Sequence, residues 1–378
     1  MSAPVRILHL HSSFAYGGKE ARAIRLMHAW GDRAVHMIVS GVPERTEARA
    51  AIGRHIRYEI AQNPPPLTGK PSVARYEAIA ACMRRFDLVL TYNWGAIDGV
   101  MARRVFPRGT PPVVHHEDGF NEDEAHRLNP VRNMYRRMAL GAAHALVVPS
   151  GRLLGVARGA WKQPEARLHL IGNGVPVEKY ARGVAADAIP GFRRRPGEIV
   201  IGAVVGLRAV KDLPLLVRAV GGIAVKVRLV IVGDGPERQA IEDAAEAMGI
   251  DDRVHLPGFL PEPWRYMGLF DIFALSSQSE QQPISVMEAM AAGLPVVAPP
   301  LGDIPKMVAE ENRPYMGVDR HEVHLRDRLQ ALATDAEARR RVGEANQAKA
   351  RAEYDEAAMI AQYKALYEGA IGRPGALG

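Results

Sequence analysis

Two glutamates, Glu280 and Glu288, have the spacing and surroundings in this chain that most suggest chemistry. They flank the start of a helix that we expect to open at Pro283 and to end at Gly293, since proline favours first turns and glycine follows last turns. The start of such a helix offers free backbone N–H groups and a positive dipole end, which suit a diphosphate. A carboxylate accepts two hydroxyl hydrogen bonds well, so the pair suits a sugar and a ribose. By spacing alone, two solvated glutamates remain the simpler interpretation.

A second polar group follows an expected buried strand in the N-terminal half. His115, His116, Glu117 and Asp118 lie at its carboxyl end, which is where ligands bind in open α/β sheets. Adjacent residues of an extended chain point to opposite faces, so we do not expect the four to converge on a metal ion. Each histidine could instead be a structural residue with satisfied hydrogen bonds.

A glycine-containing turn near the N-terminus is the third candidate. Gly17 and Gly18 would let the backbone approach a ligand closely. Glu20 would cap the following helix, favoured by the helix dipole. The turn could bind donor, acceptor or phosphate groups, or it could be a plain tight turn between a strand and a helix.

Short apolar runs alternate with helical patterns along the chain, which predicts parallel sheets covered by helices on both faces. The expected strands are residues 5–11, 34–39, 88–91, 112–115 and 145–149, and then 198–205, 227–232, 254–256, 272–275 and 296–298. Between the two sets, residues 183–196 contain Gly, Pro and three consecutive arginines, which is typical of a linker.

These patterns predict an α/β chain of two Rossmann-like parallel-sheet domains that face each other across a cleft. The first domain is expected over residues 1–190 and the second over 196–355. A last helix, at about 356–372, is expected to pack back on the first domain. Functional residues should then stand on loops at the carboxyl ends of strands.

The composition is that of a globular protein, with 47% hydrophobic and 24% charged residues in 378. We find no apolar run of about 18 residues that would span a membrane and no pattern of a secretion signal. Residues 1–200 carry 29 Lys and Arg against 17 Asp and Glu, whereas residues 201–378 carry 20 against 25. The basic half could meet phosphorylated ligands or an anionic membrane surface, unless it reflects a general preference for arginine. No nucleic-acid-binding motif is evident.

The full stretch around the two glutamates resembles the E-x7-E signature of the retaining glycosyltransferases of family GT4, which have the GT-B fold. Its continuation EAMAAGLPVVA is very similar to the sequence usual in that family. The resemblance extends along nearly the whole chain. The other matching segments, in the expected order, are FAYGGKEARAIRLM, LIGNGVPVEKY, LVIVGDGPER and VHLPGF.

The resemblance implies roles for single residues. Glu280 would contact the donor sugar and Glu288 the ribose hydroxyls. The backbone N–H groups of Ile284 and Ser285 would help to hold the diphosphate. The family's histidine near the donor sugar implies a catalytic position in the loop of residues 115–118, at His116 or Asp118, with His115 beside them.

The family also supplies two cations to the leaving diphosphate, an arginine and a lysine. Lys211 falls in the position of the lysine, whereas Gly206 occupies the position of the arginine. Either the loop shifts so that Arg208 serves, or one cation is missing.

The implied activity is a hexosyl or related transfer of class EC 2.4, metal-independent and with retained configuration. The sugar would move from a nucleotide-diphosphate sugar, UDP- or GDP-linked, to a hydroxyl of a saccharide or lipid-linked acceptor. This would serve bacterial polysaccharide, lipopolysaccharide or glycolipid synthesis, without a further cofactor. The expected location is cytoplasmic, peripheral on the inner face of the membrane. A nucleotide-sugar 2-epimerase and an inactive nucleotide-binding homologue are the alternatives.

Overall fold

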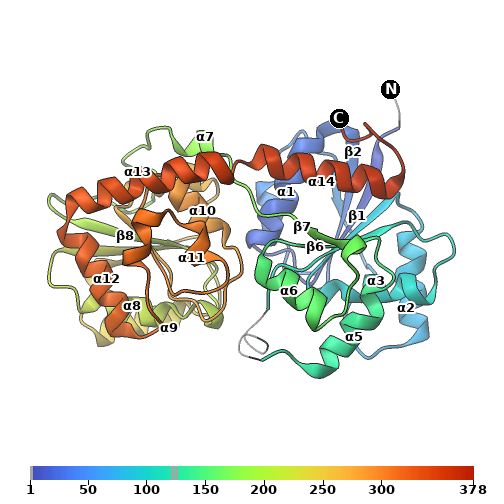
Figure 1. Cartoon of the computed structure of the whole chain (residues 1–378), viewed down its shortest axis with the longest axis horizontal. Helices are drawn as coiled ribbons and strands as arrows, with labels where there is room; N and C mark the ends of the chain where they lie inside the picture. The colour runs from blue at the N-terminus through green and yellow to red at the C-terminus, as the bar shows by residue number, and fades with distance from the viewer. Residues whose placement is uncertain (1–2, 121–123, 125–126) are drawn as a thin grey trace. The chain divides into compact units, whose positions relative to one another are not determined.

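The chain divides into two compact units, and Figure 1 shows the whole chain. The computed structural model describes residues 3–120, 124 and 127–378. The first unit comprises the chain up to Gly119, then Arg127–Gly172 and Met359–Gly378. The second consists mainly of Asn173–Ala358.

The first unit is built on a seven-stranded sheet whose strands all run parallel, in the order β3-β2-β1-β4-β5-β6-β7. The central strands are almost fully buried, as expected for a sheet covered on both faces. The strands are β1 (Val5–His11), β2 (Ala34–Ser40), β3 (Tyr58–Ile60), β4 (Leu88–Tyr92), β5 (Val113–His116), β6 (Ala145–Val148) and β7 (Leu168–Leu170).

Helices of the first unit begin at side-chain caps in several places. Ser72, Asn129 and Ser150 each accept a hydrogen bond from a backbone N–H in the first turn of α2, α5 and α6. The helices are α1 (Gly18–Trp30), α2 (Val73–Met83), α3 (Ile97–Val105), α5 (Pro130–Leu140) and α6 (Gly151–Gly159). The last helix of the chain, α14 (Glu356–Ile371), contributes Tyr363 and Tyr367 to the core that also contains Val5 of β1.

The second unit is built on a five-stranded parallel sheet in the order β10-β9-β8-β11-β12. Its strands are β8 (Ile199–Val204), β9 (Val227–Val232), β10 (Val254–Gly258), β11 (Ile272–Ala274) and β12 (Val296–Val297). Its helices are α7 (Val177–Tyr180), α8 (Leu213–Gly221), α9 (Arg238–Ala247), α10 (Ile284–Ala291), α11 (Ile304–Met307), α12 (Glu322–Thr334) and α13 (Ala336–Glu353). The prediction of two Rossmann-like parallel-sheet domains is confirmed.

The stretch predicted as a linker, residues 183–196, belongs to the second unit instead. Ile189 and Phe192 are buried in the core of that unit. Earlier in the chain, the backbone N–H of Val175 already donates to the carbonyl of Tyr354 at 2.8 Å. The unit boundary therefore lies at Gly172, before the expected position near residue 190.

Each sheet contains one point where the strand order reverses. In the first sheet this point lies between β1 and β4, and in the second it lies between β8 and β11. The connections that leave such a pair diverge to opposite sides, which opens a crevice at the carboxyl ends of the strands. None of the described helices combines the length and the apolar character needed to cross a membrane.

Candidate active site

The loops that leave β8 and β11 carry the predicted cation and the predicted carboxylate into direct contact. Lys211, at the end of a short 3-10 helix, donates from Nζ to Glu280 Oε1 at 2.5 Å. The Ser277 hydroxyl donates to the same oxygen at 2.7 Å. Both bonds end on Oε1, so Oε2 can accept a ligand hydroxyl in addition. Lys211 keeps further N–H donors for an anion.

Backbone contacts fix this pair of loops to each other. The N–H of Gln278 donates to the carbonyl of Val210 at 2.7 Å. The Ser276 hydroxyl donates to the carbonyl of Lys211 at 2.9 Å. These two contacts therefore hold the Lys211 ammonium group beside the Glu280 carboxylate. These serine and glutamine contacts could not be predicted, because such residues are ordinary in loops.

The loop that follows β12 packs closely against the backbone of the Glu280 loop. Gly302 has φ +55, and a Cβ atom there would lie 2.5 Å from the carbonyl oxygen of Glu280. The next residue, Asp303, donates its backbone N–H to the carbonyl of Gln281 at 2.8 Å. The approach of the two backbones leaves no room for a side chain at residue 302.

Helix α10 begins at Ile284 directly after Pro283, as predicted. Its N-terminus has no side-chain cap, so the first turn, with Ile284 and Ser285, has N–H groups to offer a ligand. Glu288 lies in the second turn and is buried. Burial, and then the charge of Glu288, raise the pKa of Tyr266 far above its usual value.

The Asn-Gly-Val segment before α7 contacts the loop that leads into α10. Asn173 donates its backbone N–H to the side-chain oxygen of Gln282 at 2.6 Å, and its Nδ2 donates to the Gln282 carbonyl at 3.0 Å. The sequence marks this segment as a motif of the family but does not indicate its role. Its position indicates that it holds the chain between Glu280 and the helix.

Gly206 and Arg208 form a tight turn after β8. The N–H of Arg208 donates to the carbonyl of Gly206 at 2.9 Å. A Cβ atom at Gly206 would lie 3.5 Å from Nε of Arg208, so the arginine side chain folds back over the glycine. The guanidinium therefore stands beside the position that the family's arginine would occupy.

His116 is buried in the first unit, and both of its ring nitrogens form hydrogen bonds. Its Nδ1 lies 3.2 Å from the carbonyl of Thr91 and its Nε2 lies 2.8 Å from the hydroxyl of Tyr367. Burial, and then the charge of Arg22, lower its pKa well below the usual value. His116 is therefore neutral, with Nδ1 as the donor and Nε2 as the acceptor.

The residues of the His115–Asp118 run separate to opposite faces, as expected for extended chain. His115 Nδ1 contacts the Thr91 hydroxyl at 2.7 Å, and its Nε2 lies 3.7 Å from Glu117. Glu117 also lies 3.5 Å from Arg136. His115 and Glu117 thus share a buried cluster away from His116.

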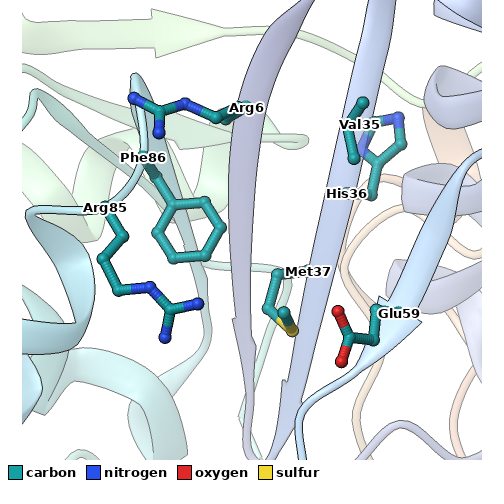
Figure 2. A pocket seen from close by; sticks show the side chains of 7 residues that line it. All are labelled: Arg6, Val35, His36, Met37, Glu59, Arg85 and Phe86. Carbon is teal, nitrogen blue, oxygen red and sulfur yellow. The ribbon is translucent and has the colours of Figure 1, made fainter.

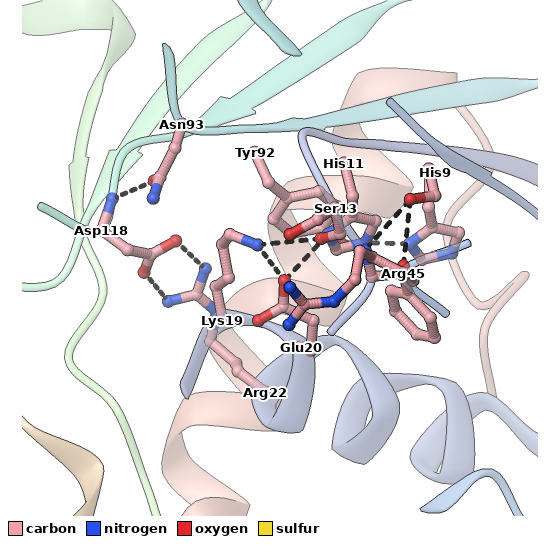
Figure 3. A network of polar contacts seen from close by, with 12 residues as sticks. His9, His11, Ser13, Lys19, Glu20, Arg22, Arg45, Tyr92, Asn93 and Asp118 are labelled. Carbon is pink, nitrogen blue, oxygen red and sulfur yellow. Dashed lines mark hydrogen bonds and ion pairs between the residues drawn. The ribbon is translucent and has the colours of Figure 1, made fainter. Parts of the chain in front are cut away.

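Asp118 forms a bidentate ion pair with Arg22 of α1, shown in Figure 3. Arg22 is only 2% exposed. Burial lowers its pKa, but the Asp118 carboxylate more than offsets this, so the pKa of Arg22 is raised above its usual value. The backbone N–H of Asp118 donates to Asn93 Oδ1 at 2.7 Å. Asp118 is therefore held as the partner of a buried cation.

The turn before α1 differs in detail from its prediction. Gly17 precedes the helix in an extended conformation with φ −176, which any residue adopts, and α1 begins at Gly18. Glu20 does not cap the helix; the N-cap makes no side-chain hydrogen bond. The Glu20 carboxylate is buried, forms an ion pair with Lys19 and lies 3.9 Å from His11 Nδ1 (Figure 3).

A buried histidine cluster on β1 and β2 was not predicted from the sequence. His9 contacts His36 Nδ1 at 3.0 Å and the Tyr92 hydroxyl at 3.1 Å. His11 stacks on Tyr92 with 4.1 Å between the ring centroids. The available signal was the alternation of His9 and His11 on one face of a strand that is otherwise apolar.

A hollow near the opposite end of the same sheet shares only His36 with the residues described above. Figure 2 shows Arg6, Met37, Glu59, Arg85 and Phe86 around it, near the amino ends of β1 and β2. Ligands in such sheets bind at the carboxyl ends. The candidate site residues therefore remain those on the loops after β8 and β11, with a second group after β1, β4 and β5.

Two family models match successive parts of the chain. Residues 16–179 match the model described as Glycosyltransferase Family 4, and residues 187–349 match the model described as Glycosyl transferases group 1. The D-inositol 3-phosphate glycosyltransferase of Corynebacterium glutamicum is 27% identical over 76% of this chain and 73% of its own length. The N-acetyl-alpha-D-glucosaminyl L-malate synthase of Bacillus anthracis is 27% identical over 42% of each chain. Several other curated relatives are matched over about a third to a half of their length.

Solved structures share the fold over nearly the whole chain. HepE from Anabaena in complex with UDP-glucose aligns with a TM-score of 0.77 at 20% identity, covering 95% of this chain and 98% of that one. WaaG, a glycosyltransferase involved in lipopolysaccharide biosynthesis, aligns with a TM-score of 0.70 at 14% identity, covering 98% and 100%. Both matching family models describe glycosyltransferases, and the solved structures show that this chain shares their two-domain fold.

Proposed function

We propose that this chain is a retaining glycosyltransferase that moves a sugar from a nucleotide-diphosphate sugar to a hydroxyl acceptor. The observation that carries the proposal is the contact of Lys211 with Glu280 at the point where the second sheet reverses its strand order. The loop after β8 supplies a cation there, and the loop after the neighbouring strand β11 supplies a carboxylate and a helix N-terminus. A nucleotide-diphosphate sugar has the matching groups, namely a diphosphate and hydroxyls.

In this proposal the second unit binds the donor. Lys211 and the first turn of α10 hold the diphosphate, and Arg208 supplies the second cation from its place beside Gly206. Glu280 accepts a hydrogen bond from a sugar hydroxyl, while Glu288 serves the ribose. HepE has been solved in complex with UDP and with UDP-glucose, which favours a UDP-sugar donor for this chain too.

The acceptor is proposed to enter at the carboxyl ends of the first sheet. Neither His116 nor Asp118 suits a general base there. The first is a buried neutral histidine with both nitrogens bonded, and the second is held by Arg22. We therefore assign the acceptor proton to the departing diphosphate, and the protein's contribution to electrostatic stabilisation of that diphosphate. No metal ion enters this mechanism.

Hydrolysis of a panel of UDP- and GDP-sugars tests the proposal, with and without EDTA. We expect slow release of nucleoside diphosphate from one donor, undiminished by EDTA, and an α-configured product from an α-configured donor. An inverted product would contradict the retaining mechanism, and strict dependence on a metal would contradict the metal-free one. Conversion of the donor to an epimer without release of nucleotide would favour the epimerase alternative, for which the relatives above give no support.

We further propose that the transfer serves assembly of a bacterial polysaccharide, lipopolysaccharide or glycolipid on the cytoplasmic side of the membrane. WaaG is described as acting in lipopolysaccharide biosynthesis, and it shares this fold. Extracts of saccharide and lipid-linked acceptors, added to the donor that the panel identifies, test this assignment. Faster donor turnover with lipid-linked than with free acceptors is the expected result.

A further inference from the structure

Asp212 follows Lys211 directly and has an unusual backbone conformation. It stands where the short 3-10 helix of residues 209–211 ends and α8 begins, with φ +46 and ψ +49. Glycine and, less often, asparagine and aspartate adopt this left-handed conformation, whereas other residues are strained in it. The turn at Asp212 therefore fixes the backbone at the end of the segment that carries Lys211.

The side chain of Asp212 forms an ion pair with Arg320. Nη2 of Arg320 donates to Oδ2 of Asp212 at 2.6 Å, and the two side chains are 30% and 21% exposed. An aspartate at the start of a helix commonly caps it, but this carboxylate makes no cap hydrogen bond with α8. Charge pairing rather than capping therefore accounts for the position of the Asp212 side chain.

The segment that carries Arg320 is held at both ends. The N–H of Gly317 donates to the carbonyl of Ala298, which follows β12, at 3.0 Å. The carboxylate of Asp319 accepts a hydrogen bond from the N–H of His321, the N-cap of α12, at 2.8 Å. Arg320 lies between these contacts, so its side chain starts from a fixed backbone.

A second ion pair joins α8 to α12, which lie side by side in the second unit (Figure 1). Arg218 of α8 donates from Nε to Glu322 of α12 at 2.9 Å, and the two side chains are 41% and 40% exposed. Of the two ion pairs, the one between Asp212 and Arg320 adjoins Lys211. The Arg218–Glu322 pair can therefore separate effects on packing from effects on Lys211.

The charges around Lys211 explain why Asp212 needs a partner. Lys211 already contacts the carboxylate of Glu280. The proposed function requires its ammonium group to attract a diphosphate as well. An unpaired carboxylate on the adjacent residue would repel the diphosphate and compete for the ammonium group, since charges a few Å apart interact appreciably near a protein surface. Paired with Arg320, Asp212 forms the turn without adding a net negative charge.

We propose that Arg320 is a positioning residue of the donor site, which neutralises Asp212 and so keeps Lys211 available to the donor diphosphate. The inference rests on the proposed function, because it concerns how Lys211 is held for that ligand. Arg320 acts through Asp212 and is assigned no contact with the donor. Its removal should therefore weaken nucleotide binding only while residue 212 carries a negative charge.

Calorimetric titration of the full chain with UDP and with GDP tests this inference. Arg320→Gln should bind the preferred nucleotide about fivefold more weakly than the wild type, as expected for loss of a partly buried counter-charge. The double variant D212N/R320Q should recover the wild-type affinity, because asparagine tolerates the left-handed conformation and carries no charge. Glu322→Gln is the matched control and should bind like the wild type. Thermal unfolding shows whether each variant is folded.

Three results would overturn the inference and leave the donor site in place. The first is wild-type affinity of Arg320→Gln. The second is equally weak binding by D212N/R320Q, because Arg320 would then not act through the charge of Asp212. The third is an equal loss in Glu322→Gln, which would assign the effect to packing between α8 and α12. A wild-type chain that binds neither nucleotide, or binds with an affinity that Lys211→Ala does not change, would overturn the proposed function and this inference together.

Discussion

Single residues in this chain form two kinds of carboxylate–cation pair. The side chain of Lys211 is 22% exposed where it meets Glu280, so a ligand can reach it. Arg22 is 2% exposed in its pair with Asp118, and its guanidinium lies 5.6 Å from the ring centroid of Tyr363. We propose that the first pair serves ligand binding and that the second stabilises the first unit.

Glu280, the carboxylate proposed to contact the donor, provides a test at the residue scale. Glu280→Gln keeps the size of the side chain but removes the charge that faces Lys211. We expect donor turnover to fall about a hundredfold while the fold is kept, because one preorganised polar group contributes on this scale. Steady-state donor hydrolysis and thermal unfolding measure the two effects. Wild-type turnover in the variant would remove Glu280 from the site.

The buried pair predicts a different outcome for Asp118→Asn. Loss of one partner leaves a buried guanidinium without its counter-charge, so the free energy of unfolding should fall by about 3 kcal/mol. Urea denaturation measures this change. Glu165→Gln is the control, because the Arg158–Glu165 pair is exposed to solvent and should contribute little. A variant as stable as the wild type but inactive would instead show that Asp118 acts in catalysis.

At the scale of elements, helices and strands were predicted well where the apolar periodicity agrees with the proline and glycine residues that bound an element. Strand β9 has the expected bounds, and α10 starts directly after Pro283. The strands β3 and β7 were missed because three residues are too few to show a period. The linker was misassigned because the burial of Ile189 and Phe192 depends on contacts with distant strands, which composition does not reveal.

The site was predictable only in part, for a similar reason. A motif gave Glu280 and Lys211, and the sheet order explains why they meet. Ser277 and Asn173 support the site through hydrogen bonds that no spacing encodes. For Asp118, the sequence indicated a position near the site but not the arginine that pairs with it.

The loop after β12 gives a test at the scale of elements. Gly302→Ala places a methyl group against the Glu280 carbonyl in a backbone conformation that alanine rarely adopts. We expect reduced stability together with reduced donor turnover, since the Glu280 loop must move. Gly155→Ala in α6 is the matched control, because nothing lies near its Cβ position and alanine favours the helix by about 0.5–1 kcal/mol. Unchanged turnover in Gly302→Ala would show that the loop positions Glu280 without this support.

Across the whole molecule, buried histidines are unevenly distributed. Among the residues that the structure describes, all five buried histidines lie in the first unit, and they are His9, His11, His36, His115 and His116. Burial lowers the pKa of His36 to about 4 and those of His9, His11 and His116 well below the usual value. Acid should therefore act on the two units differently.

The direction of this effect follows from proton linkage. The folded-state pKa of His36, about 4, lies below its usual value of 6.5, so the unfolded chain binds the proton more readily. The stability that His36 contributes is complete above pH 6.5 and is lost as the pH falls toward 4, by about 3 kcal/mol. Hydrogen exchange followed by mass spectrometry should show β1, β2 and β5, which carry these histidines, losing protection before β8 and β9. Simultaneous loss in both sheets, or earlier loss in the second, would contradict this account.

Binding of nucleoside diphosphate is the most direct test of the donor site proposed at the point where the second sheet reverses its strand order. Calorimetric titration with UDP should show binding to the wild type that Lys211→Ala weakens at least tenfold, since a charge-assisted contact to phosphate is lost. Lys226→Ala is the control, because this exposed lysine precedes β9 at the opposite end of the same sheet, and the variant should bind like the wild type. Equal affinity of all three proteins for UDP, or a loss of the same size in Lys226→Ala, would contradict the assignment of Lys211 and Glu280 to the donor.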